Sequence, residues 1–180
     1  MNVIKTIGHS NHPIGRFLAL LKAGGVELLV DVRSLPYSRR FPQFGRERLA
    51  NSLAGVGVDY AWEGEALGGR AGDYHRAAAR PAFTDALERL IGRAADHTLC
   101  LMCAEKEPLD CHRTLLVSRR LAERGAALEH LLADGGTRTQ GQIEAALLAK
   151  AAAAAADLFD DRATLLAQAY DAREKAMKRL

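Results

Sequence analysis

The sequence has little cysteine and no long apolar run, and both shortages exclude classes of protein. Cysteine occurs three times in 180 residues, at Cys100, Cys103 and Cys111. This odd, clustered set does not suit a disulfide scaffold, so we expect free thiols in a reducing compartment. No apolar run reaches the roughly 18 residues of a membrane span. The N-terminus also lacks the charged start and long apolar core of a signal peptide. We therefore expect a cytoplasmic protein with no membrane partner.

The net charge is also small, at +3, which is too little to indicate nucleic-acid binding without a local concentration of basic residues. Apolar residues make up 48% of the chain and charged residues 26%, which is typical of a globular protein rather than a disordered one. A chain of this length buries roughly 70% of its unfolded surface. One domain can therefore fold without a disulfide or a metal ion.

Short apolar runs alternate with helical patterns over the first two thirds of the chain. This alternation predicts a mostly parallel sheet with helices on both faces, an α/β fold. The expected strands are residues 3–8, 28–32, 56–60, 98–103 and 126–132. The expected helices are residues 13–23, 46–54, 81–95 and 111–124.

The last part of the chain differs in composition. Residues 1–135 form the expected α/β domain, and residues 136–180 form a tail rich in alanine, including the run 151–156. Alanine is the best helix former, so we expect one or two helices there. Their thin apolar stripe leaves three alternatives. The tail packs on the domain, pairs with a second copy in a homodimer, or remains a mobile extension.

Polar side chains follow three of the expected strands. In open α/β sheets, ligands bind outside the carboxyl ends of the strands, so these side chains should converge at one edge. The candidates at this edge are His9, Ser10, Asn11, His12, Asp31, Arg33, Cys103, Glu105, Cys111, His112 and Arg113.

Cys111 has the strongest chemical signal in this group. If Asp110 caps the following helix, Cys111 lies in the first turn, where free N–H groups and the helix dipole favour a thiolate. His112 and Arg113 would lower the thiol pKa further. Cys103 could face Cys111 as a second thiol. Cys100, inside the strand, we interpret as a core residue, because free cysteine is often buried.

Zinc is a weaker alternative for the same residues. Cys103, Cys111 and His112 could be joined by His9 or His12, since zinc prefers thiolate and imidazole. The seven residues between the cysteines exceed the usual spacing of a zinc knuckle, and the fixed charge of Arg113 disfavours a cation. We therefore expect no cofactor and no metal ligand, and keep a zinc site as the weaker hypothesis.

The arginines indicate an anion. Arg33, Arg39, Arg40 and further arginines at 46 and 48 fall in a short stretch that also contains three aromatic residues. Guanidinium groups bind carboxylate and phosphate in a bidentate way. An alternative for Arg39 and Arg40 is a solvated basic loop, and Arg33 could pair with Asp31.

Three further features have a structural and a functional interpretation. Gly68 and Gly69 would permit a close backbone approach to a ligand but match no phosphate-binding motif. Tyr74 either lines the cleft or packs in the core. We interpret His130, near the end of the last expected strand, as structural.

These residues lead to one main hypothesis and two alternatives. The main hypothesis is an enzyme acting on an anionic, phosphate-bearing or nucleotide-like substrate. Arg33, Arg39 and Arg113 would bind the anion, with Arg40, Glu105 and the Ser10–His12 turn contributing contacts. Cys111 or Cys103 would be the thiolate, His9 or His112 the acid or base, and Asp31 would orient a histidine or Arg33. The alternatives are a non-catalytic nucleic-acid-binding module using residues 33–48, and a structural zinc protein.

Five blocks of the sequence resemble the domain of unknown function 488 family. They are Thr6–His12, Leu29–Ser34, Arg39–Phe44, Leu67–Gly69, and Leu101–Lys106 together with Cys111–Arg113. The similarity runs from about residue 3 to about residue 135, and the segment after Gly69 is shorter than the family usually shows. The resemblance implies a bacterial or archaeal cytoplasmic α/β domain and names no reaction.

Overall fold

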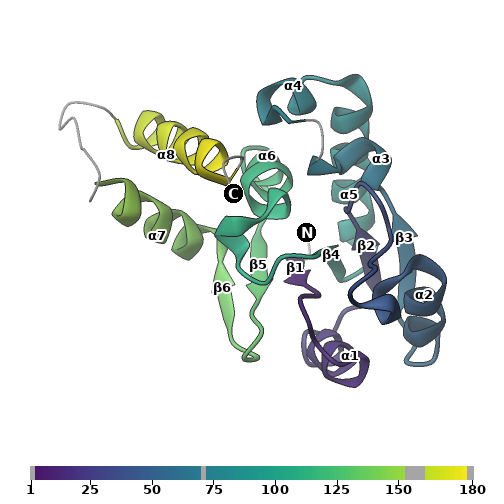
Figure 1. The fold of residues 1–180 in the computed structure, drawn as a ribbon. Coiled ribbons are helices and arrows are strands. Elements are labelled where there is room, and N and C mark those ends of the chain that lie inside the picture. Colours follow the sequence, from purple (N-terminus) through teal and green to yellow (C-terminus); the bar gives the residue numbers. More distant parts are fainter. Residues whose placement is uncertain (1–2, 70–71, 153–160, 178–180) are drawn as a thin grey trace.

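A six-stranded sheet forms the centre of the protein (Figure 1). The computed structural model describes residues 3–69, 72–152 and 161–177. The strand order is β3-β2-β4-β1-β5-β6, in which the first five strands are parallel to one another and β6 is antiparallel to β5. The strands are β1 (Ile4–Gly8), β2 (Leu28–Asp31), β3 (Asp59–Trp62), β4 (Leu99–Cys103), β5 (Leu128–Leu131) and β6 (Thr137–Thr139). The predicted α/β class is confirmed.

The helices that flank the sheet largely follow the predicted ranges. They are α1 (Ile14–Ala23), α2 (Arg46–Ala54), α3 (Gly64–Leu67), α4 (Tyr74–Ala78), α5 (Pro81–Asp96), α6 (Arg119–Ala122), α7 (Gln140–Ala152) and α8 (Arg162–Met177). The sequence did not predict β6, α3 or α4. β6 is a short, exposed edge strand without apolar residues, and the two helices have only four and five residues. Within the described ranges, no helix has the length and apolarity needed to cross a membrane.

Alternating side chains of the strands divide the core into two layers. Leu101 and Cys103 of β4 face α5, α6 and the C-terminal helices, whereas Cys100 and Met102 face α1 and α2. Such alternation is the ordinary geometry of a strand. Cys100 is fully buried in the second layer, away from the other two cysteines, which supports its interpretation as a core residue.

The predicted helix 111–124 begins at residue 113 rather than 111, and its first half is a π-helix rather than an α-helix. Pro108–Asp110 forms a separate 3₁₀ turn, and Cys111 has an extended backbone with φ −141°. A π-helix then covers Arg113–Ser118, and regular α-helix begins only at Arg119. All six π-helical residues are buried, which is more than the single apolar stripe of a surface α-helix provides. Cys111 therefore precedes the helix rather than lying in its first turn.

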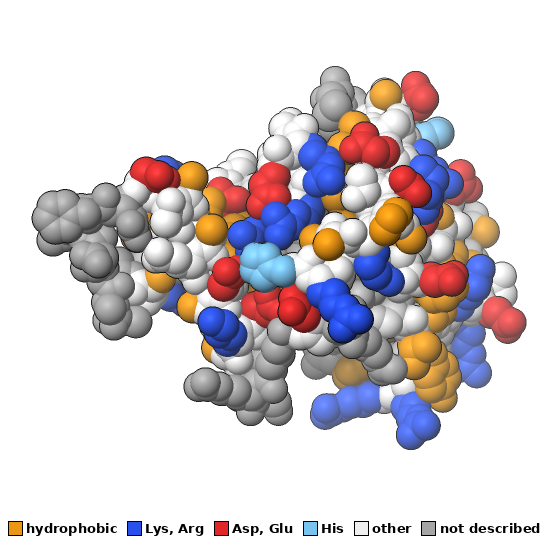
Figure 2. All heavy atoms as spheres, turned by 90° about the horizontal axis from the view of Figure 1, so that it is seen from above, with side chains coloured by type: hydrophobic (Ala, Val, Ile, Leu, Met, Phe, Trp, Pro, Cys, Tyr) orange, Lys and Arg blue, Asp and Glu red, His pale blue; other side chains and the backbone are white. Residues whose placement is uncertain are grey.

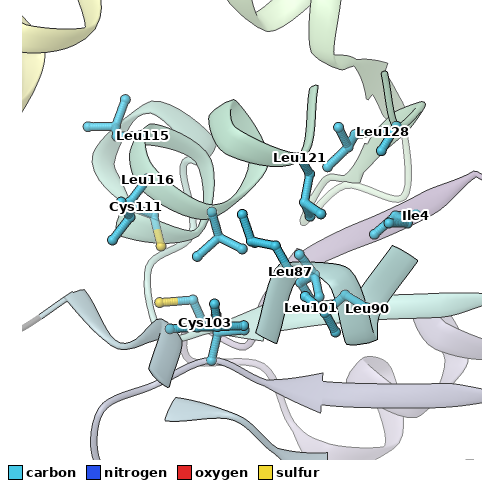
Figure 3. Packing of buried hydrophobic residues seen from close by; sticks show 14 of the residues in the cluster. Ile4, Leu87, Leu90, Leu101, Cys103, Cys111, Leu115, Leu116, Leu121 and Leu128 are labelled. Carbon is cyan, nitrogen blue, oxygen red and sulfur yellow. The ribbon is translucent and has the colours of Figure 1, made fainter. Parts of the chain in front are cut away.

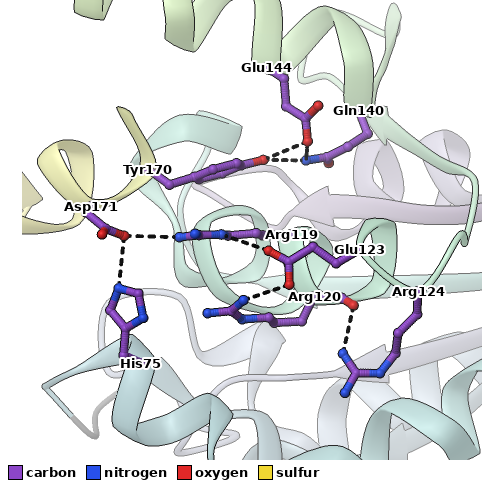
Figure 4. Close-up of polar contacts among 9 residues, drawn as sticks. All are labelled: His75, Arg119, Arg120, Glu123, Arg124, Gln140, Glu144, Tyr170 and Asp171. Carbon is purple, nitrogen blue, oxygen red and sulfur yellow. Dashed lines mark hydrogen bonds and ion pairs between the residues drawn. The ribbon is translucent and has the colours of Figure 1, made fainter. Parts of the chain in front are cut away.

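The alanine-rich tail packs on the domain. Ile143 and Leu147 of α7 and Tyr170 of α8 belong to the main core cluster. Figure 4 shows the polar contacts around Tyr170. Arg119 lies over the Tyr170 ring at 4.7 Å and donates to Asp171. Of the three alternatives for the tail, the described residues show packing on the domain. Pairing with a second copy stays a prediction, and part of the alanine run, residues 153–160, lies outside the described residues.

We expect Tyr170→Ala to lower the free energy of unfolding by about 3 kcal/mol, because it removes a side chain that is 2% exposed. Lys175→Ala, at an exposed position of the same helix, should change it by less than about 0.5 kcal/mol. Urea denaturation measures both. Equal stability of the two variants would contradict the docking of α8 on the core.

His130 is structural, as interpreted from the sequence. Its side chain is fully buried, Thr6 Oγ1 lies 2.9 Å from Nδ1, and Gln140 Oε1 lies 2.8 Å from Nε2. Arg113 Nε donates to the Thr6 oxygen, so the Thr6 hydroxyl donates to Nδ1 and Nε2–H donates to Gln140. Burial lowers the His130 pKa from its usual 6.5 to about 4.

This pKa predicts a loss of stability in acid. Between pH 6.5 and pH 4, this histidine binds a proton in the unfolded chain but stays neutral in the folded protein. The free energy of unfolding is therefore highest above pH 6.5 and falls by about 3 kcal/mol toward pH 4. His130→Gln should therefore lose about 3 kcal/mol less than the wild type over this range. The exposed His97→Gln serves as the control, and denaturation midpoints measured across the range decide the matter. The same loss in His130→Gln and wild type would contradict the assignment.

Candidate functional site

Four side chains from the carboxyl end of β4 and the loop after it form a compact cluster. Cys103 Sγ lies 2.7 Å and Cys111 Sγ 3.0 Å from the same carboxylate oxygen of Glu105, and Cys103 Sγ lies 3.3 Å from His112 Nδ1. All four potential ligand atoms lie within 4.8 Å of one another. Figure 3 shows the two sulfur atoms pointing toward each other from β4 and from the segment before the π-helix. We call these four residues the thiol cluster.

His112 is oriented by a contact on its far side. Its Nε2 lies 2.9 Å from the Val32 carbonyl oxygen, so Nε2 carries the proton and donates. The Nδ1 lone pair of a neutral ring is then directed at Cys103. A Cβ on Gly69 would lie 2.5 Å from the Cβ and Cγ of His112, so only glycine at that position leaves room for the ring. The backbone at Gly69 therefore makes a close approach, as the glycine pair suggested, but it approaches His112 rather than a ligand.

Arg113 holds the loop that carries Glu105. Its guanidinium donates to the Glu105 carbonyl at 2.6 Å and to the Lys106 carbonyl at 3.3 Å. The side chain is fully buried and is not among the residues that line the pocket described below, so it supports the loop. A Cβ on Gly8 would overlap the same Glu105 carbonyl, which explains the glycine at the end of β1.

The pKa of Cys111 shifts in the opposite direction to the one expected from the sequence. Burial raises its thiol pKa above the usual value, and the nearby Cys103 raises it further, whereas a helix N-terminus was expected to lower it. The reason is the extended conformation and complete burial of Cys111. Burial would also raise the pKa of Glu105, but thiol hydrogen bonds from both cysteines outweigh it and lower that pKa. The cluster thus contains an ionised carboxylate between two thiols.

A second polar group lies beside the cluster, at the end of β2. Asp31 accepts from Arg33 Nε at 2.9 Å and from Nη2 at 2.6 Å, a bidentate ion pair that is almost fully buried. Arg33 Nη1 donates to His9 Nε2 at 3.2 Å, and His9 Nδ1–H donates to the Ser10 carbonyl. Burial lowers the His9 pKa to about 4, so the ring is neutral. His9 therefore positions Arg33, and both of its nitrogens are occupied.

Both groups border one pocket of about 300 Å³. This volume lies at the lower end of the range typical of small-molecule sites. Arg33, Cys103, Glu105 and His112 line it, as predicted for the carboxyl edge of the sheet. The other lining residues are Ser34, Leu35, Tyr37, Gly69, Tyr74, Ala104 and Met177.

Some predicted residues lie elsewhere, and some lining residues were not predicted. Ser10, Asn11 and His12 form the turn after β1 and do not line this pocket, and Arg39 and Arg40 are exposed on the following loop. Met177 reaches the pocket from α8, and no local pattern in the sequence could indicate that contact. The glycine pair was the available signal for the wall next to His112.

We expect Gly69→Ala to displace the His112 ring and to lower stability by about 1–3 kcal/mol, because the added methyl group overlaps the imidazole. Gly92→Ala is the matched control, since a Cβ there meets no atom within 4 Å. Urea denaturation and the imidazole proton signals of His112 in NMR spectra measure the two effects. An unshifted His112 signal in Gly69→Ala would contradict the packing described above.

The comparisons with known proteins identify a family but no activity. The family model described as "Domain of unknown function DUF488" matches residues 13–120, which is more than half of the chain. The matched region includes β2, β4 and the whole thiol cluster. No curated protein and no solved structure matches the chain. The chain therefore belongs to the DUF488 family.

Proposed function

We propose that this protein is an enzyme acting on a small anionic, phosphate-bearing or nucleotide-like substrate in the pocket at the carboxyl edge of the sheet. One observation carries the proposal. Three residues of the thiol cluster, Cys103, Glu105 and His112, line the same pocket of about 300 Å³ as Arg33. The cluster supplies reactive groups, and Arg33 supplies donors for an anionic oxygen. Perturbed titratable groups that converge in a pocket are characteristic of active sites.

Arg33 is suited to this role by its rigidity. Asp31, His9 and the Phe44 carbonyl accept from four of its five N–H groups, which leaves one on Nη1 for a ligand. Because Asp31 balances its charge, Arg33 would contribute one directed hydrogen bond rather than a free positive charge. A guanidinium held in this way is already oriented before the substrate binds, which lowers the entropic cost of binding.

The remaining pocket wall suits a ring attached to the anionic group. Tyr37 is 64% exposed and Tyr74 is largely buried, and both line the pocket. Aromatic side chains at such positions stack on planar rings. A pocket of about 300 Å³ would admit a small phosphate ester or part of a nucleotide.

The basic loop supports the alternative of a nucleic-acid-binding module. Arg39 and Arg40 are exposed, and Arg40 lies 5.7 Å from the centre of the Phe41 ring. On the face displayed in Figure 2, basic and acidic side chains are interspersed. We favour the enzyme because Arg33 and three residues of the thiol cluster line one pocket, and the two proposals differ in the residues that binding requires.

Ligand binding can be followed with the single tryptophan, because Trp62 Nε1 donates to the Arg33 carbonyl at 2.9 Å. We expect AMP and inorganic phosphate to change its fluorescence. Ala104→Phe, which fills the pocket without removing a polar contact, should weaken AMP binding at least roughly tenfold. Arg39→Gln with Arg40→Gln should leave binding by the pocket intact.

The opposite pattern would overturn the proposal. If Ala104→Phe binds AMP as the wild type does, while the double arginine variant loses a strongly salt-dependent affinity for DNA or RNA, the chain is a nucleic-acid-binding module. Turnover is tested on a panel of phosphate esters that includes p-nitrophenyl phosphate. Cys103→Ser should lower turnover by about 10²–10⁴-fold with AMP binding retained, and Cys100→Ser should lower neither.

A further inference from the structure

We infer that Cys103, Cys111, His112 and Glu105 bind a single zinc ion, which would form the reactive centre of the pocket. The inference rests on the proposed function for the role of the ion in catalysis, but not for its binding. It differs from the zinc site considered from the sequence, because Glu105 replaces His9 or His12. Two thiols, one imidazole and one carboxylate are all ligands that zinc accepts.

The spacing of the four donor atoms fits one tetrahedral ion. Zinc–ligand bonds of about 2.0–2.3 Å separate tetrahedral donors by roughly 3.3–3.8 Å. In the cluster, three pairs of donors lie 2.7, 3.0 and 3.3 Å apart, and no pair is more than 4.8 Å apart. Shifts of a few tenths of an ångström to about one ångström in side-chain position would create the coordination shell.

With a neutral His112 ring, the hydrogen-bond count leaves the cluster one proton short. Cys103 and Cys111 have one S–H each, and both point at the same Glu105 oxygen. His112 has its proton on Nε2, where it donates to Val32. If Cys103 donates to Glu105, Nδ1 of His112 receives nothing, although it lies 3.3 Å from the sulfur. A cation among these acceptors satisfies all of them at once.

The surrounding contacts are those that orient metal ligands. A ligating histidine usually donates its other ring N–H to a carbonyl or carboxylate, as His112 does to Val32. The backbone N–H of Arg113 donates to Cys111 Sγ at 3.4 Å, which would stabilise a thiolate there. The backbone of Gly69 packs against the His112 ring and so limits movement of the ring toward that side.

The charge of Arg113 also favours the site. Its guanidinium is fully buried, and its hydrogen-bond acceptors are the neutral Glu105 and Lys106 carbonyls and the Thr6 hydroxyl. Among the residues of the described chain, no carboxylate pairs with it. Two thiolates, a carboxylate and Zn²⁺ together carry a charge of −1, which compensates a buried arginine. Arg113 is therefore a suitable neighbour for this centre, contrary to the expectation from the sequence.

The other group of potential ligands in the described chain does not compete. His75, Asp171 and Glu174 also lie close together, but His75 is more than half exposed. Asp171 accepts from Arg119, and Glu174 accepts from the Tyr74 backbone. These contacts already use the carboxylates, and the group offers no sulfur ligand.

Glu105 would occupy the exchangeable position of the ion. It is the exposed member of the cluster, whereas both cysteines are buried. Catalytic zinc sites keep three firm protein ligands and a fourth position open to water or substrate. Because Glu105 lines the pocket with Cys103 and His112, water from the pocket could replace its carboxylate at the ion.

The test uses the full-length protein dialysed against a chelator and then titrated with Zn²⁺ or Co²⁺. We expect one equivalent of zinc by elemental analysis. Co²⁺ should give a near-ultraviolet band of thiolate-to-metal charge transfer and the intense visible bands of a tetrahedral site. Both readouts use the wild type, so they do not depend on the folding of any variant.

Matched variants assign the ligands. Cys103→Ser, Cys111→Ser and His112→Gln should each weaken binding more than about 100-fold, and circular dichroism verifies that they fold. Cys100→Ser, a buried cysteine on the other face of β4, should bind as the wild type does. Glu105→Gln should still bind one equivalent, with a smaller loss than the other three.

Absence of the charge-transfer band, or isolation of a metal-free protein with a Cys103–Cys111 disulfide, would overturn the inference. Unchanged binding in Cys103→Ser would do the same. These outcomes leave the AMP titration and the Ala104→Phe variant unaffected, so failure of the zinc site is distinct from failure of the proposed enzyme. Conversely, zinc binding without AMP binding or turnover would indicate a structural zinc protein.

Discussion

The buried guanidinium of Arg113 is the contact on which the candidate site depends. It ties the carbonyls of Glu105 and Lys106 to Thr6 in the middle of β1, and the glycine at position 8 makes room for this loop. Without these hydrogen bonds, nothing would hold the loop after β4 in the conformation that directs the Glu105 carboxylate toward the two sulfur atoms. Burying a charge that has only neutral hydrogen-bond partners costs folding free energy, so this geometry is held at the expense of stability.

The alternation of side chains along β4 decides which cysteines can act together. Cys103 lies two residues beyond Leu101 and shares its face, on the side of α5 and the π-helix, whereas Cys100 faces α1 and α2. A shift of one residue in the strand would exchange these faces. The parallel pairing of β4 with both β1 and β2 fixes the register, and so brings the Asp31–Arg33 pair beside the thiol cluster.

The sequence was sufficient to predict the sheet edge but not the arrangement of atoms there. Strand periodicity and the rule that parallel strands end together are enough to predict that Asp31, Arg33 and Cys103 lie at one edge of the sheet. The extended backbone of Cys111 was missed, because Pro108 and Asp110 resemble an ordinary helix start while burial of the next residues selects a π-helix. The burial of Arg113 was missed for a similar reason, since a local pattern does not show whether an arginine reaches solvent or a carbonyl.

Part of the pocket lies inside the region that matches the family and part lies outside it, and this difference bears on substrate specificity. The thiol cluster and Arg33 lie inside the region that matches the DUF488 family, whereas Met177 reaches the same pocket from α8, outside it. Two side chains of α8 help to hold it there: Arg173 donates to Leu109 and Asp110, just before Cys111, and Glu174 accepts from the Tyr74 backbone. The reactive groups thus belong to the family domain, and the tail closes one wall of the pocket. It follows that substitutions in α8 would alter which substrates fit the pocket. Substitutions in the loop after β4 would alter the reaction that a bound substrate undergoes.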